Sequence, residues 1–405
     1  MKPLLSLLLI VLLLPSVKPQ PHQHKEQDYI LLGAHRLEIY MPLIKGKTVG
    51  IVANHSTLIN GTHLVDSLLR LGVRIGKIFS PEHGFRGHAD AGELVHNHTD
   101  TLTGLPVISL YGSRRKPSPQ DLQGVDIILF DLQDVGVRFY TYISTMHYVM
   151  EACAENGVPM VVLDRPNPNG FYVDGPVLDP RFKSFVGMHP VPLVHGMTIG
   201  EFAMMINGEG WLANGVKCEL TVVPCANYTH SSMYILPIRP SPNLPNQTSI
   251  YLYPSLGLFE GTQISVGRGT DYPFQIFGHP KLPPTGFSFT PESRPGASKN
   301  PPHLGVKCHG IDLREYSHQY FISRASINLE WIAYAYQKFP RKDKFFNNFF
   351  NQLAGNDILR KQISQGLSPE QIRETWAEGI ETFMGVRAKY LLYPDFTTSN
   401  NYGQE

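Results

Sequence analysis

Cysteine is scarce in this chain, and its four copies are scattered. They form neither a CxxC pair nor the dense pattern of a disulfide scaffold, which excludes a small disulfide-stapled fold and a thiolate metal site. Cys218 and Cys225 are the pair that could form a disulfide after export, and buried free thiols are the alternative.

Net charge is equally small. Lys and Arg number 35 against 34 Asp and Glu, which leaves a formal charge of +1. Such a balance gives no broad field to attract nucleic acid or an acidic membrane. We therefore expect no nucleic-acid partner, and any ligand has to be recognised by local groups.

Long apolar runs are confined to the N-terminus. Lys2 is followed by apolar residues from Leu4 to Leu14, and the run ends at Pro15 before a polar stretch. This is the form of a secretory signal peptide, and it is shorter than the roughly 20 residues that a membrane span needs. We expect residues 1–20 to be a signal peptide and the protein to be secreted or periplasmic, without stable membrane insertion after cleavage. An uncleaved anchor is the alternative, and no Cys follows the run to accept a lipid.

Several catalytic signatures are also missing. The sequence has no GxxxxGK[ST] phosphate loop, no GxGxxG after the first predicted strand, no GxSxG nucleophile elbow and no HExxH. A loose group of histidines, His83, His88, His96 and His98, matches the spacing of no common metal site. We expect neither a metal ion nor a cofactor.

What the chain does have is an alternation of short β-branched runs with segments of helical period, which predicts an α/β fold with a mostly parallel sheet. The apolar runs are continuous, as in strands that are covered on both faces. The predicted strands are 48–56, 74–81, 106–112, 125–131 and 159–166, and the predicted helices are 62–71, 119–123, 141–156 and 197–211.

A change of composition near Pro237 marks a boundary or a long ordered loop, because IRPSPNLPNQT brings several prolines and asparagines together. The sequence therefore predicts a Rossmann-like catalytic domain over 28–236 and a smaller C-terminal α/β domain over 237–405 that completes a cleft. Helices are expected in the second domain at 326–339 and 369–390.

Polar residues follow the predicted strands at the points where they end. In an open parallel sheet, ligands bind outside the carboxyl ends of the strands. One such residue alone is often a helix cap, but four strands with polar ends favour a shared site. The residues are Asn54 and His55; Glu82, His83 and Arg86; Asp131, Gln133 and Asp134; and Arg165 and Asn167.

Glu82 is the strongest catalytic candidate. It lies in the motif SPEHGFRG, where Pro81 and Gly84 restrict the turn and hold the carboxylate at the strand end. The alternative is a structural Glu82 that pairs with Arg86 and merely closes the loop.

Further candidates lie downstream. The segment FDLQDVGVRFYTYIST combines acidic and aromatic residues, a composition typical of a sugar-binding wall, and we expect Tyr140 or Tyr142, but not both, to contact the ligand. The other candidates for substrate binding are Arg138, His195, Asn243, Glu260 and Arg268.

The ordered motifs resemble those of the exo-β-N-acetylmuramidases, from about Gly50 to the C-terminus. The motifs include SPEHGFRG, DAGELV, FDLQDVGVRFYTYISTM, LDRPNPNG, HGMTIGE, PSPNLP and EGTQISVGRGTDYPF. The resemblance implies a glycoside hydrolase that removes terminal β-linked N-acetylmuramic acid from the non-reducing end of peptidoglycan fragments. It also implies that Glu82 is catalytic, and that the active cleft lies between a Rossmann-like domain and a smaller α/β domain.

Departures from the family pattern are few. The usual EGTN becomes EGTQ at Gln263, the usual PFE becomes PFQ at Gln275, and PNPING is shortened so that Asn169 follows Pro168. These changes affect the exact substrate more than the reaction.

Such hydrolysis usually needs a protonated carboxylic acid at the leaving oxygen and a second carboxylate that attacks the sugar or activates water. We expect Glu82 to be the acid, with Asp134 and Asp131 first and Glu260 next as its partner. The substrate's own 2-acetamido group is a further alternative. The lactyl carboxylate of muramic acid calls for a cation, and the candidates are Arg86, Arg138, Arg165 and Arg268.

Two rival functions are compatible with the sequence. A non-catalytic protein that binds muropeptides or MurNAc-GlcNAc disaccharides would tolerate loss of Glu82. A metal-dependent phosphoesterase would lose its activity in the presence of a chelator.

Overall fold

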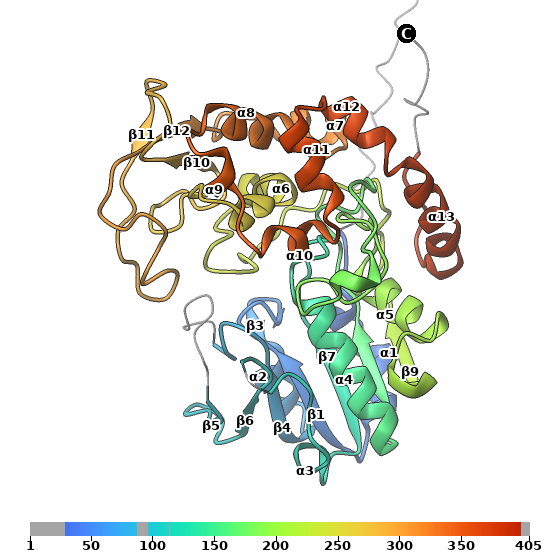
Figure 1. Ribbon diagram of the computed structural model, residues 1–405. Helices are drawn as coiled ribbons and strands as arrows, with labels where there is room; N and C mark the ends of the chain where they lie inside the picture. Colours follow the sequence, from blue (N-terminus) through green and yellow to red (C-terminus); the bar gives the residue numbers. More distant parts are fainter. Residues whose placement is uncertain (1–28, 87–95, 113, 398–405) are drawn as a thin grey trace, which may run out of the picture.

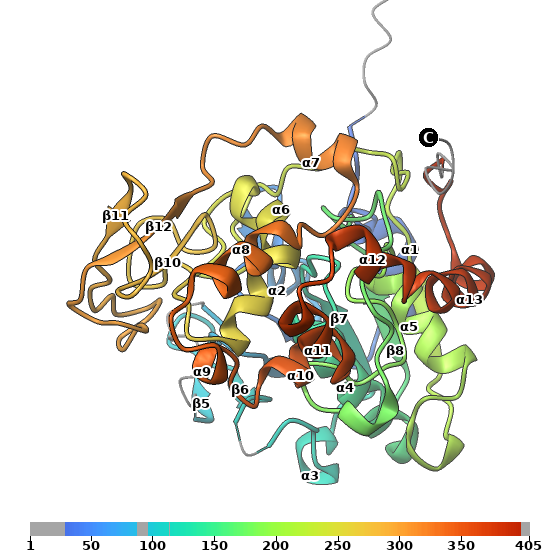
Figure 2. The same ribbon diagram turned by 45° about the horizontal axis from the view of Figure 1, so that its top comes forward.

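The computed structural model describes residues 29–86, 96–112 and 114–397, so that the expected signal peptide lies outside the described residues. In Figure 1 a large sheet with its helices occupies the lower half of the molecule, and the yellow to red segments of the C-terminal half lie above it. Figure 2, in which the top of the molecule is turned forward by 45°, shows helices α8 (Glu330–Lys338), α11 (Ile358–Gln365) and α12 (Pro369–Glu374) spread over the C-terminal half.

The large sheet has seven strands in the order β5-β6-β4-β1-β7-β8-β9. All neighbouring strands are parallel except β5 and β6. This confirms the expected α/β fold with a mostly parallel sheet. The strands are β1 (Thr48–Ala53), β4 (Arg74–Ser80), β5 (His98–Thr99), β6 (Pro106–Ser109), β7 (Ile127–Asp131), β8 (Met160–Leu163) and β9 (Leu220–Val223), and a hairpin of β2 (Leu58–Ile59) and β3 (Thr62–His63) follows β1.

Helices cover both faces of the sheet, because alternate side chains of its central strands point in opposite directions. Ile51 and Leu129 pack with α1 (Leu37–Ile44) and α2 (Leu64–Arg70). Val52 and Phe130 belong to the core of the other face, with α4 (Tyr142–Asn156) and α5 (Ile199–Gly208). The short helices of this half are η1 (Gly33–His35), α3 (Pro119–Leu122), η2 (Pro180–Phe182) and η3 (Ala213–Gly215).

The C-terminal half combines helices with a three-stranded antiparallel sheet in the order β10-β12-β11. Its strands are β10 (Ile276–His279), β11 (Ser288–Phe289) and β12 (Cys308–Asp312). Its helices are α6 (Gln247–Leu256), η4 (Gly257–Gly261), α7 (His318–Arg324), α8 (Glu330–Lys338), α9 (Lys342–Phe345), α10 (Phe350–Ala354), α11 (Ile358–Gln365), α12 (Pro369–Glu374), α13 (Ala377–Arg387) and η5 (Ala388–Tyr390).

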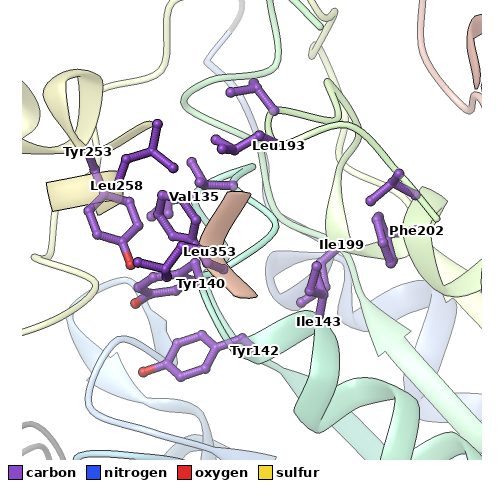
Figure 3. Packing of buried hydrophobic residues seen from close by; sticks show 14 of the residues in the cluster. Val135, Tyr140, Tyr142, Ile143, Leu193, Ile199, Phe202, Tyr253, Leu258 and Leu353 are labelled. Atoms are coloured by element: carbon purple, nitrogen blue, oxygen red, sulfur yellow. The ribbon is translucent and has the colours of Figure 1, made fainter. Parts of the chain in front are cut away.

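One apolar core runs through both halves. Figure 3 shows Tyr253, Leu258 and Leu353 of the C-terminal half beside Val135 and Tyr140 of the segment that follows β7. The two halves are therefore joined by packed side chains and not only by a linker.

Two predicted helices differ from the structure. The helix expected at 326–339 begins at Glu330, because the backbone N–H groups of Ile327 and Asn328 donate to Asp174 Oδ2 (2.7 Å) and Ser255 Oγ (2.8 Å) and hold an irregular turn. The helix expected at 369–390 is two helices, α12 and α13, which are separated at the buried Trp376.

All four cysteines are buried free thiols, so Cys218 and Cys225 do not form a disulfide in the structure. In the part of the chain that the structure describes, no helix has the length and apolar character needed to cross a bilayer.

Candidate active site

A cavity of about 460 Å³, counted with its open mouth, lies where the sheet meets the C-terminal half. Glu82 and His83 reach it from the turn after β4, and residues 139–142 from the start of α4. The other side is formed by the C-terminal half. Its contribution consists of Ser241, Asn243 and Leu244, of Tyr253 on α6, and of Arg268 and Phe274.

The turn that carries Glu82 is tightly held. The N–H of Gly84 donates to the carbonyl of Pro81 (3.2 Å), and His83 and Gly84 both have left-handed backbone angles, with φ of 70° and 76°. Such an angle is rare for a residue with a side chain and persists only where its surroundings enforce it. His83 Nε2 lies 3.2 Å from Ser241 Oγ, so the turn is also tied to the opposite wall.

Tyr111, which follows β6, lies beside Glu82. Burial raises the pKa of the Tyr111 phenol, and the Glu82 carboxylate raises that pKa further by its charge and by accepting a hydrogen bond. A strand end that the sequence did not point to, that of β6, thus brings a side chain next to Glu82.

Three tyrosines form an aromatic wall of the cavity (Figure 3). The rings of Tyr140 and Tyr142 meet edge to face with centroids 4.8 Å apart, and Tyr253 lies 6.1 Å from Tyr140. The hydroxyl of Tyr140 donates to the carbonyl of Pro240 (2.9 Å), and that of Tyr142 accepts from Asn54 Nδ2 (2.8 Å). Both Tyr140 and Tyr142 line the cavity, and the expectation that only one of them contacts the ligand stays a prediction.

Arg268 provides a cation in the cavity wall. Its Nε and Nη2 lie 2.9 and 2.8 Å from Glu260 Oε1, and its guanidinium lies 5.0 Å from the centroid of the Phe274 ring. Nη1 is enclosed and has no hydrogen-bond partner. Burial alone would lower the pKa of Arg268, but the carboxylates of Glu260 and Glu82 outweigh it and raise that pKa. The group is thus a fixed positive charge with donor capacity to spare.

Comparison with known proteins gives the family. Residues 49–248 match the model described as "Exo-beta-N-acetylmuramidase NamZ, N-terminal", and residues 251–393 match the corresponding C-terminal model. The chain belongs to the NamZ family. The two models meet at the start of α6, whereas the sequence placed a boundary at 236/237.

The similarity to other proteins in sequence and structure extends over nearly the whole chain. The peptidoglycan β-N-acetylmuramidase NamZ of Bacillus subtilis (strain 168) is 41% identical over 374 residues, which are 87% of this chain and 89% of that protein. Two crystal structures of DUF1343 family proteins from Bacteroides fragilis NCTC 9343 superpose with TM-scores of 0.85 and 0.75. Their sequences are 47% and 29% identical to this one. The superposed residues make up 91% and 90% of this chain, and 99% of each of those two chains.

Within this NamZ fold, three of the four arginines considered for the lactyl group have other partners. Arg138 is 0% exposed, and its Nη1 and Nη2 donate to four backbone carbonyls. Arg165 holds Asp131 through Nε and Nη2. Arg86 binds Asp100 through Nε (3.1 Å) and Nη2 (2.9 Å) and therefore braces the loop. None of the three lines the cavity, so the placement favours Arg268.

The carboxylates expected to face Glu82 are enclosed behind the cavity wall. Asp131 is 0% exposed and engaged by Arg165, and Asp134 Oδ2 accepts from the N–H of Gly136 (2.7 Å). Neither residue lines the cavity. Among the described residues, Glu82 is the one carboxylate in the lining, and the expectation that Asp131 or Asp134 faces it finds no support in the placement.

The remaining strand-end candidates also serve the scaffold. Gln133 Nε2 donates to the carbonyls of Asp134 and Pro166, and Asn167 Nδ2 to that of Met197. His195 is buried and lies 3.7 Å from Asp134. Asn54 is 0% exposed and does not line the cavity, but its side chain donates a hydrogen bond to Tyr142, which does. Asn243 does line the cavity, and its Oδ1 is enclosed without a partner.

The sequence did not indicate Tyr111, Ser241, Tyr253 or Phe274. Tyr111 could have been found, because it lies at the carboxyl end of a predicted strand, where the strand-end rule applies. Tyr253 lies inside a helix of mostly apolar residues, and no local pattern distinguishes it from a core tyrosine. Within the described ranges, no group of three or more His, Cys, Asp or Glu residues is arranged to hold a metal ion.

Proposed function

We propose that this protein is an exo-acting glycoside hydrolase that releases β-1,4-linked N-acetylmuramic acid from the non-reducing end of peptidoglycan fragments. Family membership and the name of the Bacillus relative support the reaction class. The observation that carries the proposal is the presence, in one cavity, of Glu82 and of a guanidinium with a donor to spare. The substrates are muropeptides and MurNAc-GlcNAc disaccharides, which have a glycosidic oxygen that Glu82 can protonate and a lactyl group that lies within reach of the guanidinium.

Glu82 acts as the general acid in this proposal. Its turn is fixed by a left-handed His83 and by the contact of His83 with Ser241, which holds the carboxyl group in one place beside the tyrosine wall. Fixed geometry of this kind allows a proton to pass to the glycosidic oxygen as the bond breaks.

We infer that the nucleophile that attacks the anomeric carbon is the 2-acetamido group of the substrate and not a second carboxylate of the protein. Asp131 is bound by Arg165, Asp134 lies outside the lining, and Glu260 is occupied with Arg268. The acetamido oxygen would attack the anomeric carbon while the bond to the leaving oxygen breaks and Glu82 protonates that oxygen. Water would then open the resulting ring at the anomeric carbon and return a proton to Glu82, with net retention of configuration.

Arg268 reads the lactyl carboxylate, which distinguishes muramic acid from glucosamine. Its Nε and Nη2 are held by Glu260, so the free Nη1 is presented without further ordering of the side chain. A hydrogen bond from a guanidinium to a carboxylate contributes about 1.5–3 kcal/mol.

Glu82→Gln tests the acid. Two substrates are compared, the MurNAc-GlcNAc disaccharide and a nitrophenyl β-muramide, whose good leaving group needs little protonation. Loss of a general acid costs about 10²- to 10⁴-fold, and we expect this loss in kcat for the disaccharide and a smaller one for the nitrophenyl glycoside.

Glu38→Gln is the matched control, because Glu38 is an exposed carboxylate on α1 that does not line the cavity. Near wild-type turnover of the disaccharide by Glu82→Gln would contradict the assignment of Glu82 as the acid. Binding of the disaccharide without turnover by the wild type and by Glu82→Gln would favour the non-catalytic muropeptide-binding protein.

The sugar's own participation is tested by the product. The anomer formed first, read by proton NMR, should be β, and replacement of the N-acetyl by an N-trifluoroacetyl group should lower kcat strongly because its oxygen is a poorer nucleophile. An α-anomer as the first product would rule this step out.

Arg268→Met tests the recognition of muramic acid. It should lower kcat/KM for the nitrophenyl β-muramide by roughly 10- to 100-fold, the equivalent of the energy above, while the corresponding glucosaminide is hardly affected. Equal losses for both substrates would show that Arg268 does not read the lactyl group.

We further propose that the protein is secreted or periplasmic. The apolar run from Leu4 to Leu14 supports export. Sequencing the N-terminus of the mature protein from its native host should show cleavage near residue 20, and an intact Met1 would contradict it.

A further inference from the structure

A second hollow borders the catalytic cavity. It encloses about 1340 Å³, counted with its open side, and is wider and more open than the cavity that holds Glu82. Its walls come from the same two segments that wall the cavity, residues 239–245 and 269–273, together with residues 294–297. We call this hollow the outer groove.

The cavity and the outer groove share a partition. Along one segment, Ser241 and Leu244 line the cavity, Pro242 and Pro245 line the outer groove, and Asn243 lines both. The second segment repeats the arrangement, since Arg268 and Phe274 face the cavity while Gly269 and Pro273 face the groove. The outer groove is therefore adjacent to the cavity and within reach of a glycan chain that extends out of it.

The partition is held from below. His55 Nε2 lies 2.9 Å from the carbonyl oxygen of Arg239, and the Tyr140 hydroxyl donates to the carbonyl of Pro240 (2.9 Å). Asn243 Nδ2 donates to the carbonyl of Ala297 (2.9 Å). Asn243, which lines both hollows, has its Oδ1 enclosed without a partner. Buried acceptors in proteins normally have a donor, and a ligand bound at this place can supply the one that Asn243 Oδ1 lacks.

The outer groove carries positive charge. Arg239 is exposed and forms no ion pair within the described ranges of the chain. Arg294 pairs with Asp271 and donates through Nε to the carbonyl of Gly269 (3.2 Å). The groove thus has two guanidinium groups and one carboxylate in its lining, which leaves an excess of one positive charge. The proline rings in the same lining offer rigid apolar surfaces on which a sugar ring can lie.

We propose that the outer groove binds the part of the glycan strand that lies beyond the scissile bond, and that Arg239 and Arg294 bind the lactyl carboxylate of its next muramic acid. This inference rests on the proposed function. In a glycan strand without peptides, muramic acid alternates with glucosamine, so the sugar that directly follows the released residue is uncharged and the next one carries a free, anionic lactyl carboxylate. The enclosed Asn243 Oδ1 accepts from the acetamido N–H of the uncharged sugar.

The experiment compares MurNAc-GlcNAc with the tetrasaccharide MurNAc-GlcNAc-MurNAc-GlcNAc. The quantity measured is the ratio of kcat/KM for the tetrasaccharide to that for the disaccharide. We expect the wild type to prefer the tetrasaccharide, and Arg239→Met to lower the ratio about tenfold. Arg294→Met should lower it less, because Asp271 already offsets part of that charge.

Two controls isolate the carboxylate. Arg181→Met removes an exposed arginine that lines neither hollow, and it should leave the ratio unchanged. A tetrasaccharide whose internal lactyl carboxylate is converted to its amide should lose the advantage with the wild type, and Arg239→Met should then add no further loss.

Failure of this inference can be told apart from failure of the proposed function. Equal kcat/KM for both substrates with the wild type, or a ratio that Arg239→Met does not change, would overturn the role of the outer groove while the muramidase stands. If neither substrate is hydrolysed, the proposed function fails, and calorimetric Kd values for the same two saccharides and the same variants then decide the groove, with the same tenfold change expected.

Discussion

Arg138 connects the two halves of the molecule, and its replacement should reveal this in the free energy of unfolding. Its Nη1 donates to the carbonyls of Pro176 and Val191 (both 2.7 Å), and its Nη2 to those of Leu353 (3.1 Å) and Ala354 (2.7 Å). The last two belong to α10 in the C-terminal half. Burial lowers the pKa of Arg138 to about 9, so the group remains charged at neutral pH.

Arg138→Met removes a donor from four carbonyls, although the carbonyl of Val191 keeps the N–H of Leu178 (3.1 Å). Each such loss costs about 1–3 kcal/mol, but the desolvation of the guanidinium is recovered and the contributions are not additive. We expect the free energy of unfolding to fall by about 3–5 kcal/mol and the Tm by roughly 10 °C, measured by chemical denaturation and by calorimetry.

The control is Arg181→Met, which removes an arginine that is 76% exposed and paired only with Asp179. It should change the Tm by no more than a degree or two. If Arg138→Met instead kept its Tm while kcat/KM for the muramide collapsed, Arg138 would be a substrate-binding residue and the structural account would be refuted.

Three further predictions concern the site and its supports. Glu260→Gln should raise KM for the nitrophenyl β-muramide several-fold with little change in kcat, because the guanidinium that it holds becomes mobile; an unchanged KM would contradict this. Tyr142→Phe should lower the free energy of unfolding by about 1–3 kcal/mol, since Asn54 Nδ2 loses its acceptor, and urea titration measures it. Burial would raise the pKa of Asp100, but hydrogen bonds from Arg86 outweigh it and lower that pKa below its ordinary 3.8. The stability that Asp100→Asn removes, about 1 kcal/mol, should thus be present at pH 7 and vanish as the pH falls below about 4; a difference that persists at pH 2 would contradict the pairing.

The parallel sheet was predictable because its strands are apolar on both faces and β-branched. Continuous apolar runs such as IILF at residues 127–130, when they alternate with helical segments, fit few structures other than the buried strands of a parallel sheet. The breaks within helices were not predictable. The division between α12 and α13 depends on the burial of Trp376, a tertiary contact that overrides the helical pattern on either side.

The candidate site was predicted in part. The strand-end rule led to Glu82 and His83, which line the cavity, because both follow a central strand at the open edge of the sheet. The same rule led to Asp131 and Arg165, which neutralise each other beneath the C-terminal half. Position after a strand gives the edge of the sheet, but it does not tell which side chains will be covered by a second layer.

The cavity draws its two kinds of group from different parts of the chain. Glu82 comes from the turn after β4, whereas Arg268, Tyr253 and Phe274 come from the C-terminal half. With the roles proposed above for Glu82 and Arg268, the group that protonates the glycosidic oxygen and the groups that recognise the sugar can change separately in evolution. A relative that kept SPEHG and altered only the loops above it would keep the reaction and acquire a new substrate.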